Sequence, residues 1–168
     1  MYNSNKAIIF GGVFLVFIFF FTNIKSLPTV FHQKTNNVPT YLVSYKNRIW
    51  WTSQNGELLC TAKSADVLKK VVVSGVDVEE LFVKKDSFEI INLLKDILDD
   101  PYIAEIRIKQ KCAILLKGVI LYFSDWNDLV NHVSSLKDLI PIMQPKTEYY
   151  LTSAGLVYKI RGGGGEEE

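Results

Sequence analysis

The sequence of 168 residues contains 19 lysines and arginines against 18 aspartates and glutamates, and 48% of its residues are hydrophobic. A net charge of +1 provides no overall field that would favour nucleic acid or a strongly acidic partner. Setting aside an apolar amino-terminal segment leaves about 120 residues, which is enough for one small domain.

The first predicted element is a membrane anchor over residues 7–24. No charged or hydrogen-bonding side chain occurs between Ala7 and Phe21. At the α-helical rise of about 1.5 Å per residue, residues 7–24 span roughly 27 Å, close to the ~30 Å hydrocarbon core of a bilayer. The segment therefore has the length and polarity of a single-pass transmembrane helix.

A cleaved signal peptide is the main alternative for the same segment. Signal peptidase requires small residues just before the cut, but the stretch from Phe19 to Ile24 contains no such triplet. A helix buried in a protein core would carry a polar face, which this segment lacks. The sequence favours an anchor that is not removed.

The part of the chain after the anchor is dominated by predicted strands. Residues 25–39 contain two prolines and show no hydrophobic period, which predicts a linker. Trp50 and Trp51 are adjacent in a predicted strand, so their side chains should point to opposite faces of the sheet. Runs of β-branched and aromatic residues bounded by turn residues predict strands at 41–45, 48–52, 57–61, 103–109, 112–116, 119–123, 148–152 and 156–161.

Two amphipathic helices interrupt these strands. The first is predicted from Asp86 to Leu98, with Asp86 and Glu89 as a capping box. Upstream of it, residues 64–73 fit either a short helix or extended chain. The second helix is predicted to begin after a cap at Ser124 or Asp125.

The second helix is predicted to run to about Ile140, and two strands follow it. This order indicates an α+β fold, in which a single transmembrane helix precedes an antiparallel or mixed sheet with two main amphipathic helices. The predicted organisation is a short cytoplasmic tail (1–6), a transmembrane helix (7–24), a linker (25–39), an extracytoplasmic α+β domain (40–161) and a flexible acidic tail (162–168).

Residues capable of chemistry are scattered. His32 and His132 have no partners at metal-ligand spacing, and His132 is expected to be a solvated residue on its helix. Cys60 and Cys112 could form a disulfide outside the cytoplasm, but two reduced cysteines are favoured. Ser153 has no nucleophile-elbow context, and no phosphate-binding glycine loop occurs. We therefore expect no enzymatic activity, no metal site and no cofactor.

An anchored domain without a reactive site is most simply a binding module. The strand from Leu156 to Arg161 is the last predicted element, so it could lie at a sheet edge. Its unpaired N–H and C=O groups would then accept a strand from a partner. A protected edge or an interior position is the alternative.

Three stretches carry a resemblance to a known family. They are PTYLVSYKNRIWWTSQNGELL from residue 39, PYIAEIRI from residue 101, and EYYLTSAGLVYKI from residue 148. In this order, after a single membrane span, they resemble the FtsQ/DivIB family of bitopic bacterial division proteins. The resemblance covers residues 39–161.

The resemblance implies a scaffold of the bacterial divisome that organises septal cell-wall synthesis. Its amino terminus would be cytoplasmic, and its domain would lie outside the inner membrane at the division septum. Its partners would be FtsB/DivIC-like and FtsL-like coiled-coil membrane proteins, captured largely by strand addition. Carried over by position, the partner-binding residues would be Tyr150, Ser153, Leu156, Val157, Tyr158 and Lys159.

The sequence departs from the family pattern in two places. The family carries a POTRA domain between its anchor and its β domain, whereas here Lys25 to Pro39 is the whole connection. Family members also often have a tryptophan near the position of Lys159. The alternative function is a membrane-anchored cell-envelope enzyme or hydrolase accessory protein.

Overall fold

The computed structural model describes residues 37–161. The predicted cytoplasmic tail, transmembrane helix and acidic tail, with most of the predicted linker, lie outside the described residues. Among residues 37–161, no helix has the length and apolar character needed to span a bilayer.

The described chain contains eleven strands, three α-helices and three short 3₁₀ helices. The strands are β1 (Pro39–Tyr45), β2 (Arg48–Ser53), β3 (Leu58–Thr61), β4 (Val72–Ser74), β5 (Val78–Glu79), β6 (Phe82–Val83), β7 (Ile103–Arg107), β8 (Cys112–Leu115), β9 (Ile120–Phe123), β10 (Glu148–Leu151) and β11 (Val157–Arg161). The helices are α2 (Ser64–Val67), α3 (Lys85–Leu93) and α4 (Trp126–Leu139), with 3₁₀ turns η2 (Lys95–Ile97), η3 (Leu116–Gly118) and η4 (Ile140–Ile142).

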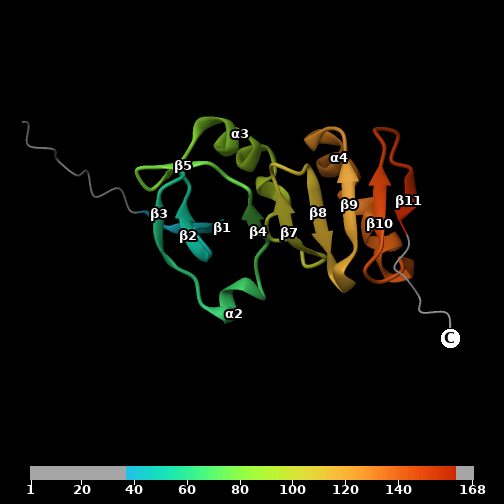
Figure 1. The fold of residues 1–168 in the computed structure, drawn as a ribbon, viewed down its shortest axis with the longest axis horizontal. Coiled ribbons are helices and arrows are strands. Elements are labelled where there is room, and N and C mark those ends of the chain that lie inside the picture. The colour runs from blue at the N-terminus through green and yellow to red at the C-terminus, as the bar shows by residue number, and fades with distance from the viewer. Residues whose placement is uncertain (1–36, 162–168) are drawn as a thin grey trace, which may run out of the picture. The chain divides into compact units, whose positions relative to one another are not determined.

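Nine of these strands form one mixed sheet. Their order is β11-β10-β9-β8-β7-β4-β1-β2-β3, and β5 with β6 forms a separate hairpin. The pairs β1–β4, β4–β7 and β9–β10 are parallel, and the other pairs are antiparallel. Figure 1 shows this succession across the molecule, with β11 at one end of the sheet. The predicted α+β class is confirmed for the described residues.

Helices α3 and α4 cover one face of the sheet. The side chains that fill this interface are nearly inaccessible to solvent, and fully burying an aliphatic side chain contributes about 1.5–3 kcal/mol. The sheet contributes Ile106, Ala113, Leu121 and Leu151, and the helices contribute Ile91, Leu129 and Leu136. On the opposite face of β8–β11 most side chains are only half buried, although Cys112 of β8 is buried there. We call this surface the open face; it is formed by Ile114, Ile120, Tyr122, Tyr150 and Tyr158.

Helix α4 begins as the sequence predicts, with Asp125 as its N-cap. The Asp125 carboxylate accepts a hydrogen bond from the Asn127 N–H at 2.8 Å, and the Asp125 N–H donates to the Asp128 carboxylate at 3.1 Å. This reciprocal pair is a capping box, which satisfies amides that the first helical turn leaves unpaired. Ser124, the other predicted cap, lies just outside the helix.

The predicted cap of the earlier helix is wrong. Helix α3 begins one residue before Asp86, after Lys84 in an extended conformation, and no side chain caps it. Asp86 lies inside the first turn, where a carboxylate is stabilised by the helix dipole rather than by a capping bond. The helix also ends at Leu93, and η2 replaces the last predicted turn, so the Asp86–Leu98 range joined two elements.

Residues 64–73 form both of the predicted alternatives in succession. They begin as the one-turn helix α2 and end in β4, which lies between β1 and β7 and runs parallel to both. The hairpin β5–β6 was not predicted, because its strands have only two residues each. The three-stranded opening of the sequence is therefore joined to the later strands through β4.

Adjacent residues on β2 confirm the predicted alternation. Trp50 packs against the core, whereas the Trp51 indole donates to the Asp66 carboxylate of α2 at 3.2 Å on the other side. On β7, however, Ala104 is exposed beside the buried Ile103, because the register shifts there. Strict alternation along residues 103–109 predicts Ala104 on the covered face with Ile106 and Ile108. This prediction is wrong, because a β-bulge interrupts the alternation.

The two cysteines are free thiols, as the sequence favours. Cys60 is exposed on β3 and Cys112 is buried on β8. Five strand spacings separate β3 from β8 in the sheet order, which corresponds to roughly 24 Å. A disulfide between them would require the sheet to come apart.

Candidate functional site

The six predicted partner-binding residues gather at one end of the sheet. Tyr150 lies on β10, Ser153 and Leu156 flank the turn, and the other three lie on β11. Strand β11 is the edge of the nine-stranded sheet and pairs with β10 alone. The predicted edge position is therefore observed, whereas the binding role of these residues stays a prediction.

The turn between β10 and β11 is tightly built. The Thr152 N–H donates to the Leu156 carbonyl, and the Gly155 N–H donates to the Thr152 carbonyl, each at 2.9 Å. Gly155 has a φ of +78°, a conformation that side chains disfavour. These bonds fix where β11 begins.

Helix α4 supports this turn through His132. Its Nε2 lies 3.0 Å from the Ser153 carbonyl oxygen, and a Cβ at Gly155 would lie 2.8 Å from its Nδ1. His132 is thus half buried against the turn, and the predicted solvated position is wrong. The sequence holds no signal for this contact, since about twenty residues separate the two segments.

The N–H and C=O groups of successive β11 residues point alternately toward β10 and toward the outer edge of the sheet. Thr152 and Leu156 form a hydrogen-bonded pair at the turn, and Tyr150 lies opposite Tyr158 two positions further along. Hydrogen-bonded pairs alternate along an antiparallel ladder. Tyr158 therefore turns its N–H and C=O toward β10, whereas Val157 and Lys159 turn theirs outward.

The side chains of residues 156–160 alternate between an exposed apolar row and the face that the helices cover. Leu156, Tyr158 and Ile160 are 57%, 53% and 55% exposed. On the other side Val157 packs against the core, and the Lys159 ammonium donates to the Gln144 side-chain carbonyl at 2.6 Å. Ile160 was not among the predicted residues, although its alternation with the other two could have identified it.

Tyrosines continue the exposed row onto the neighbouring strands. Tyr122 of β9 lies beside Tyr150 of β10, which lies beside Tyr158 of β11. The Tyr150 hydroxyl is hydrogen-bonded to the Ser124 hydroxyl, and partial burial raises the pKa of Tyr122 above its ordinary value. Rings that combine apolar area with a polar tip are typical of binding surfaces.

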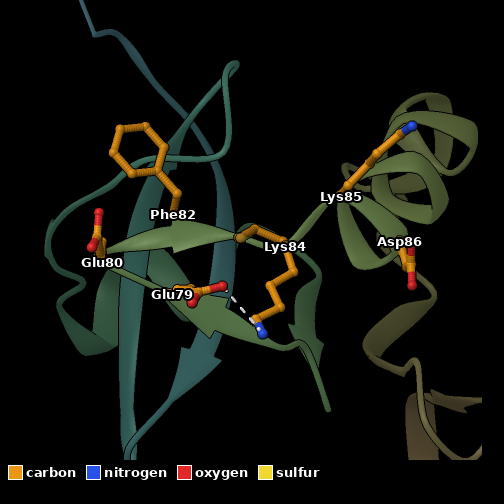
Figure 2. Close-up of a pocket in the computed structure, with 7 residues that line it drawn as sticks. Glu79, Glu80, Phe82, Lys84, Lys85 and Asp86 are labelled. Carbon is orange, nitrogen blue, oxygen red and sulfur yellow. Dashed lines mark ion pairs between the residues drawn. The ribbon is translucent and has the colours of Figure 1, made fainter.

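A second candidate is an open hollow of about 570 Å³ beside the β5–β6 hairpin (Figure 2). Glu80 and Leu81 form the hairpin tip with φ angles of +48° and +69°. The Phe82 ring points away from the side where Glu79 and Lys84 meet. The lining consists of Glu79, Glu80, Phe82, Val83, Lys84, Lys85 and Asp86.

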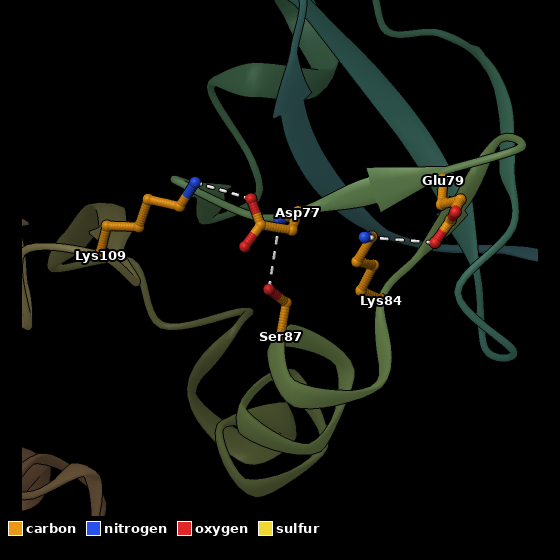
Figure 3. A network of polar contacts seen from close by, with 5 residues as sticks. All are labelled: Asp77, Glu79, Lys84, Ser87 and Lys109. Carbon is orange, nitrogen blue, oxygen red and sulfur yellow. Dashed lines mark hydrogen bonds and ion pairs between the residues drawn. The ribbon is translucent and has the colours of Figure 1, made fainter.

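Ion pairs engage some of the charged groups in and beside this hollow (Figure 3). Lys84 approaches Glu79 at 3.2 Å, and Lys109 donates to Asp77 at 2.7 Å. The hydrogen bond from Lys109 holds the pKa of Asp77 below its ordinary value, and the Ser87 hydroxyl accepts from the Asp77 N–H at 3.2 Å. This arrangement ties the segment before the hairpin to α3 and to the turn that follows β7.

A smaller cavity of about 180 Å³ lies between β1 and α3. It is lined in part by Tyr41, whose buried hydroxyl has no hydrogen-bond partner among the described residues. Burial raises the pKa of Tyr41 to about 12, so the ring remains a neutral phenol. Residues 37–161 also contain no group of three or more His, Cys, Asp or Glu side chains placed to hold a metal.

Comparison with known protein families identifies a family for most of the described chain. A family model described as a domain of unknown function, DUF4894, matches residues 42–161. No curated protein and no solved structure matches the chain.

Proposed function

This chain belongs to the DUF4894 family, and we propose that it is a non-enzymatic membrane scaffold that captures a partner strand along β11. The proposed setting is the bacterial divisome, with the domain outside the inner membrane and residues 7–24 as its anchor. The proposed partners are FtsB/DivIC-like and FtsL-like single-pass coiled-coil proteins, and the proposed outcome is organised septal cell-wall synthesis.

The observation that supports this proposal most is the exposed edge of β11. A soluble domain normally protects an edge strand with charged side chains, prolines or a covering segment. Here three exposed side chains along this edge, Leu156, Tyr158 and Ile160, are apolar, and the ammonium of the exposed Lys159 is engaged by Gln144. Such an edge supplies both backbone groups and apolar area to an added strand.

In this proposal the backbone of the edge strand provides affinity for a partner strand, and its side chains provide selectivity. The outward N–H and C=O groups of Val157 and Lys159 would bond to the backbone of any extended partner. Leu156 and Tyr158 would contact alternate side chains of that partner on the open face, and Tyr150 would extend the contact onto β10. Ser153 and His132 would act at a distance, by holding the turn that starts the strand.

The order of the sequence motifs supports the divisome setting. The resemblance to FtsQ/DivIB rests on three motifs in the same order within residues 39–161. The polar clusters described above are ion pairs at the surface, which favours a scaffold over an enzyme. The proposal covers the contacts of the β domain alone and assigns none of the contacts that a POTRA domain makes in that family.

The test is capture of partners by the full-length tagged protein from cross-linked bacterial membranes. Val157→Pro removes an outward N–H but leaves the bonds between β10 and β11 in place. We expect this variant to lose most of the small coiled-coil division proteins identified by mass spectrometry, whereas Val157→Ala retains them.

Leu156→Pro is the comparison variant, because it disrupts the turn and not the outer edge. The Leu156 N–H donates to the Thr152 hydroxyl at 3.1 Å and does not point outward. Undiminished capture by Val157→Pro would contradict strand addition at this edge. Recovery of an unrelated enzyme complex that ignores both prolines would contradict the divisome setting.

A further inference from the structure

The exposed row of β11 is complementary to itself. Leu156, Tyr158 and Ile160 follow at every second position, with the tyrosine at the centre and an aliphatic side chain on either side. An antiparallel copy of the same row therefore places an aliphatic side chain opposite each aliphatic side chain and a ring opposite the ring. Cross-strand apolar pairs of this kind stabilise antiparallel pairing.

We propose that two copies of this chain pair antiparallel through β11, with Tyr158 opposite Tyr158 of the second copy. In this register the outward backbone groups of Val157 meet those of Lys159 in the second copy, so they bond reciprocally. Leu156 lies opposite Ile160 of the second copy on the open face. This inference depends on the exposed edge and not on the identity of the proposed division partners.

Charge and strand length select this register over its neighbours. Shifting the two-fold axis to Lys159 places two ammonium groups opposite each other, which is unfavourable. Shifting it to Val157 places most of the strand beside the turn at Ser153–Gly155 of the second copy, where the ladder ends. Centring on Tyr158 pairs the five residues from Leu156 to Ile160 in each strand and separates the lysines.

The pairing has a built-in limit. The register between β10 and β11 shifts near Glu148, where Arg161 rather than Ile160 is the next partner after Lys159. Ile160 is the extra residue of this bulge, which twists the edge, so regular pairing ends with the contact between Ile160 and Leu156 of the second copy. The interface is therefore short, and short interfaces form weak, reversible complexes whose population depends on confinement in one membrane.

Self-pairing and capture of a partner strand use the same outward groups. A chain paired with its own copy hides the apolar row and cannot add another strand. The pair would thus protect the edge until a partner with a longer or better-matched strand displaces the second copy. Self-association should fall as the partner concentration rises.

Cysteine cross-linking of the full-length protein in membranes tests the register. In a Cys60→Ser background, Tyr158→Cys should form a disulfide-linked dimer under mild oxidation, because directly opposite Cα atoms lie within about 4.5–5.5 Å. Leu156→Cys alone should yield several-fold less dimer. Leu156→Cys mixed with a differently tagged Ile160→Cys should restore it as a mixed dimer.

Two further variants make the outcome decisive. Adding Val157→Pro to Tyr158→Cys should abolish the cross-link, while circular dichroism reports whether the domain still folds. Equal cross-linking at positions 156, 158 and 159, or none at 158 in a folded protein, would overturn the proposal. If the cross-linking fails but the wild type still captures division partners, only the self-pairing is wrong and the proposed function is unaffected. If the wild type captures no division partners but the cross-link forms as expected, only the proposed function is wrong.

Discussion

At the residue scale, His132 packs against the turn that precedes the edge strand. A helix side chain that looked solvated in the sequence supports the turn instead, because its ring meets the Ser153 carbonyl and leaves no room for a Cβ at Gly155. The glycine is required twice, once for its positive φ and once for this close approach. Gly118 has a similar φ of +71°, but a Cβ built there would lie 3.8 Å from its nearest neighbour, a side-chain carbon of Lys146.

These two glycines form a matched pair for a stability measurement. Gly118→Ala should cost about 1 kcal/mol, the usual penalty of a left-handed alanine. Gly155→Ala should cost clearly more, because the new methyl group also displaces the His132 ring. The measurement is the free energy of unfolding in denaturant, and addition of His132→Ala should recover the excess. Equal costs at both glycines would mean that the ring yields freely.

At the element scale, α4 owes its start to one carboxylate. Asp125 accepts from the backbone and the side chain of Asn127, and these bonds hold the pKa of Asp125 below its ordinary value. A depressed carboxyl pKa stabilises the folded state above the unfolded pKa, and this contribution is lost as pH falls through the folded value. The cap matters for binding because α4 also supports the turn before β11.

The pH dependence of thermal unfolding tests the cap. Asp125→Asn keeps an accepting oxygen but cannot titrate, so its melting temperature should fall less than that of the wild type between pH 5 and pH 2.5. Asp125→Ala should melt a few degrees lower than both at pH 7. If the wild type and Asp125→Asn decline in parallel, the titration of Asp125 does not contribute to acid unfolding.

At the scale of the whole domain, the sheet order separates its two edges and its two cysteines. The edge strand β3 carries the exposed Cys60, and the interior strand β8 carries Cys112. Burial raises the pKa of the Cys112 thiol, which keeps it protonated and slow to react. The two edges also differ in character, because β3 has four residues, whereas β11 and the preceding Leu156 present a row of exposed apolar side chains at every second position.

Thiol labelling of the full-length protein tests this arrangement. One thiol should react rapidly with a maleimide in the folded protein, and the second should react only on unfolding. Cys60→Ser should remove the rapid phase, and Cys112→Ser should leave it unchanged. An intramolecular disulfide, seen as two unreactive thiols that return after reduction, would contradict the strand order.

Local patterns in the sequence determined the elements whose periodicity is long and whose partners are near in the chain. The stripe of α4 and its Asp125 cap, the hairpin turns and the exposed alternation of β11 all follow from spacings within about fifteen residues. The α+β class follows from their order. The same reasoning misplaced the start of α3 and the inward position of Ala104, because a cap and a bulge depend on which neighbours compete for the backbone.

Tertiary structure alone decided which strands became neighbours and which edge remained open. The three-residue strand β4 has no periodicity of its own, yet it joins the two halves of the sheet by parallel pairing with β1 and β7. The contact of His132 with the turn and the row of Tyr122, Tyr150 and Tyr158 arise in the same way. The sequence alone determined that β11 could be an edge strand. Only the packing of the whole sheet left its outer side without a partner strand among the described residues, because the place of each strand depends on which edges the other strands already fill.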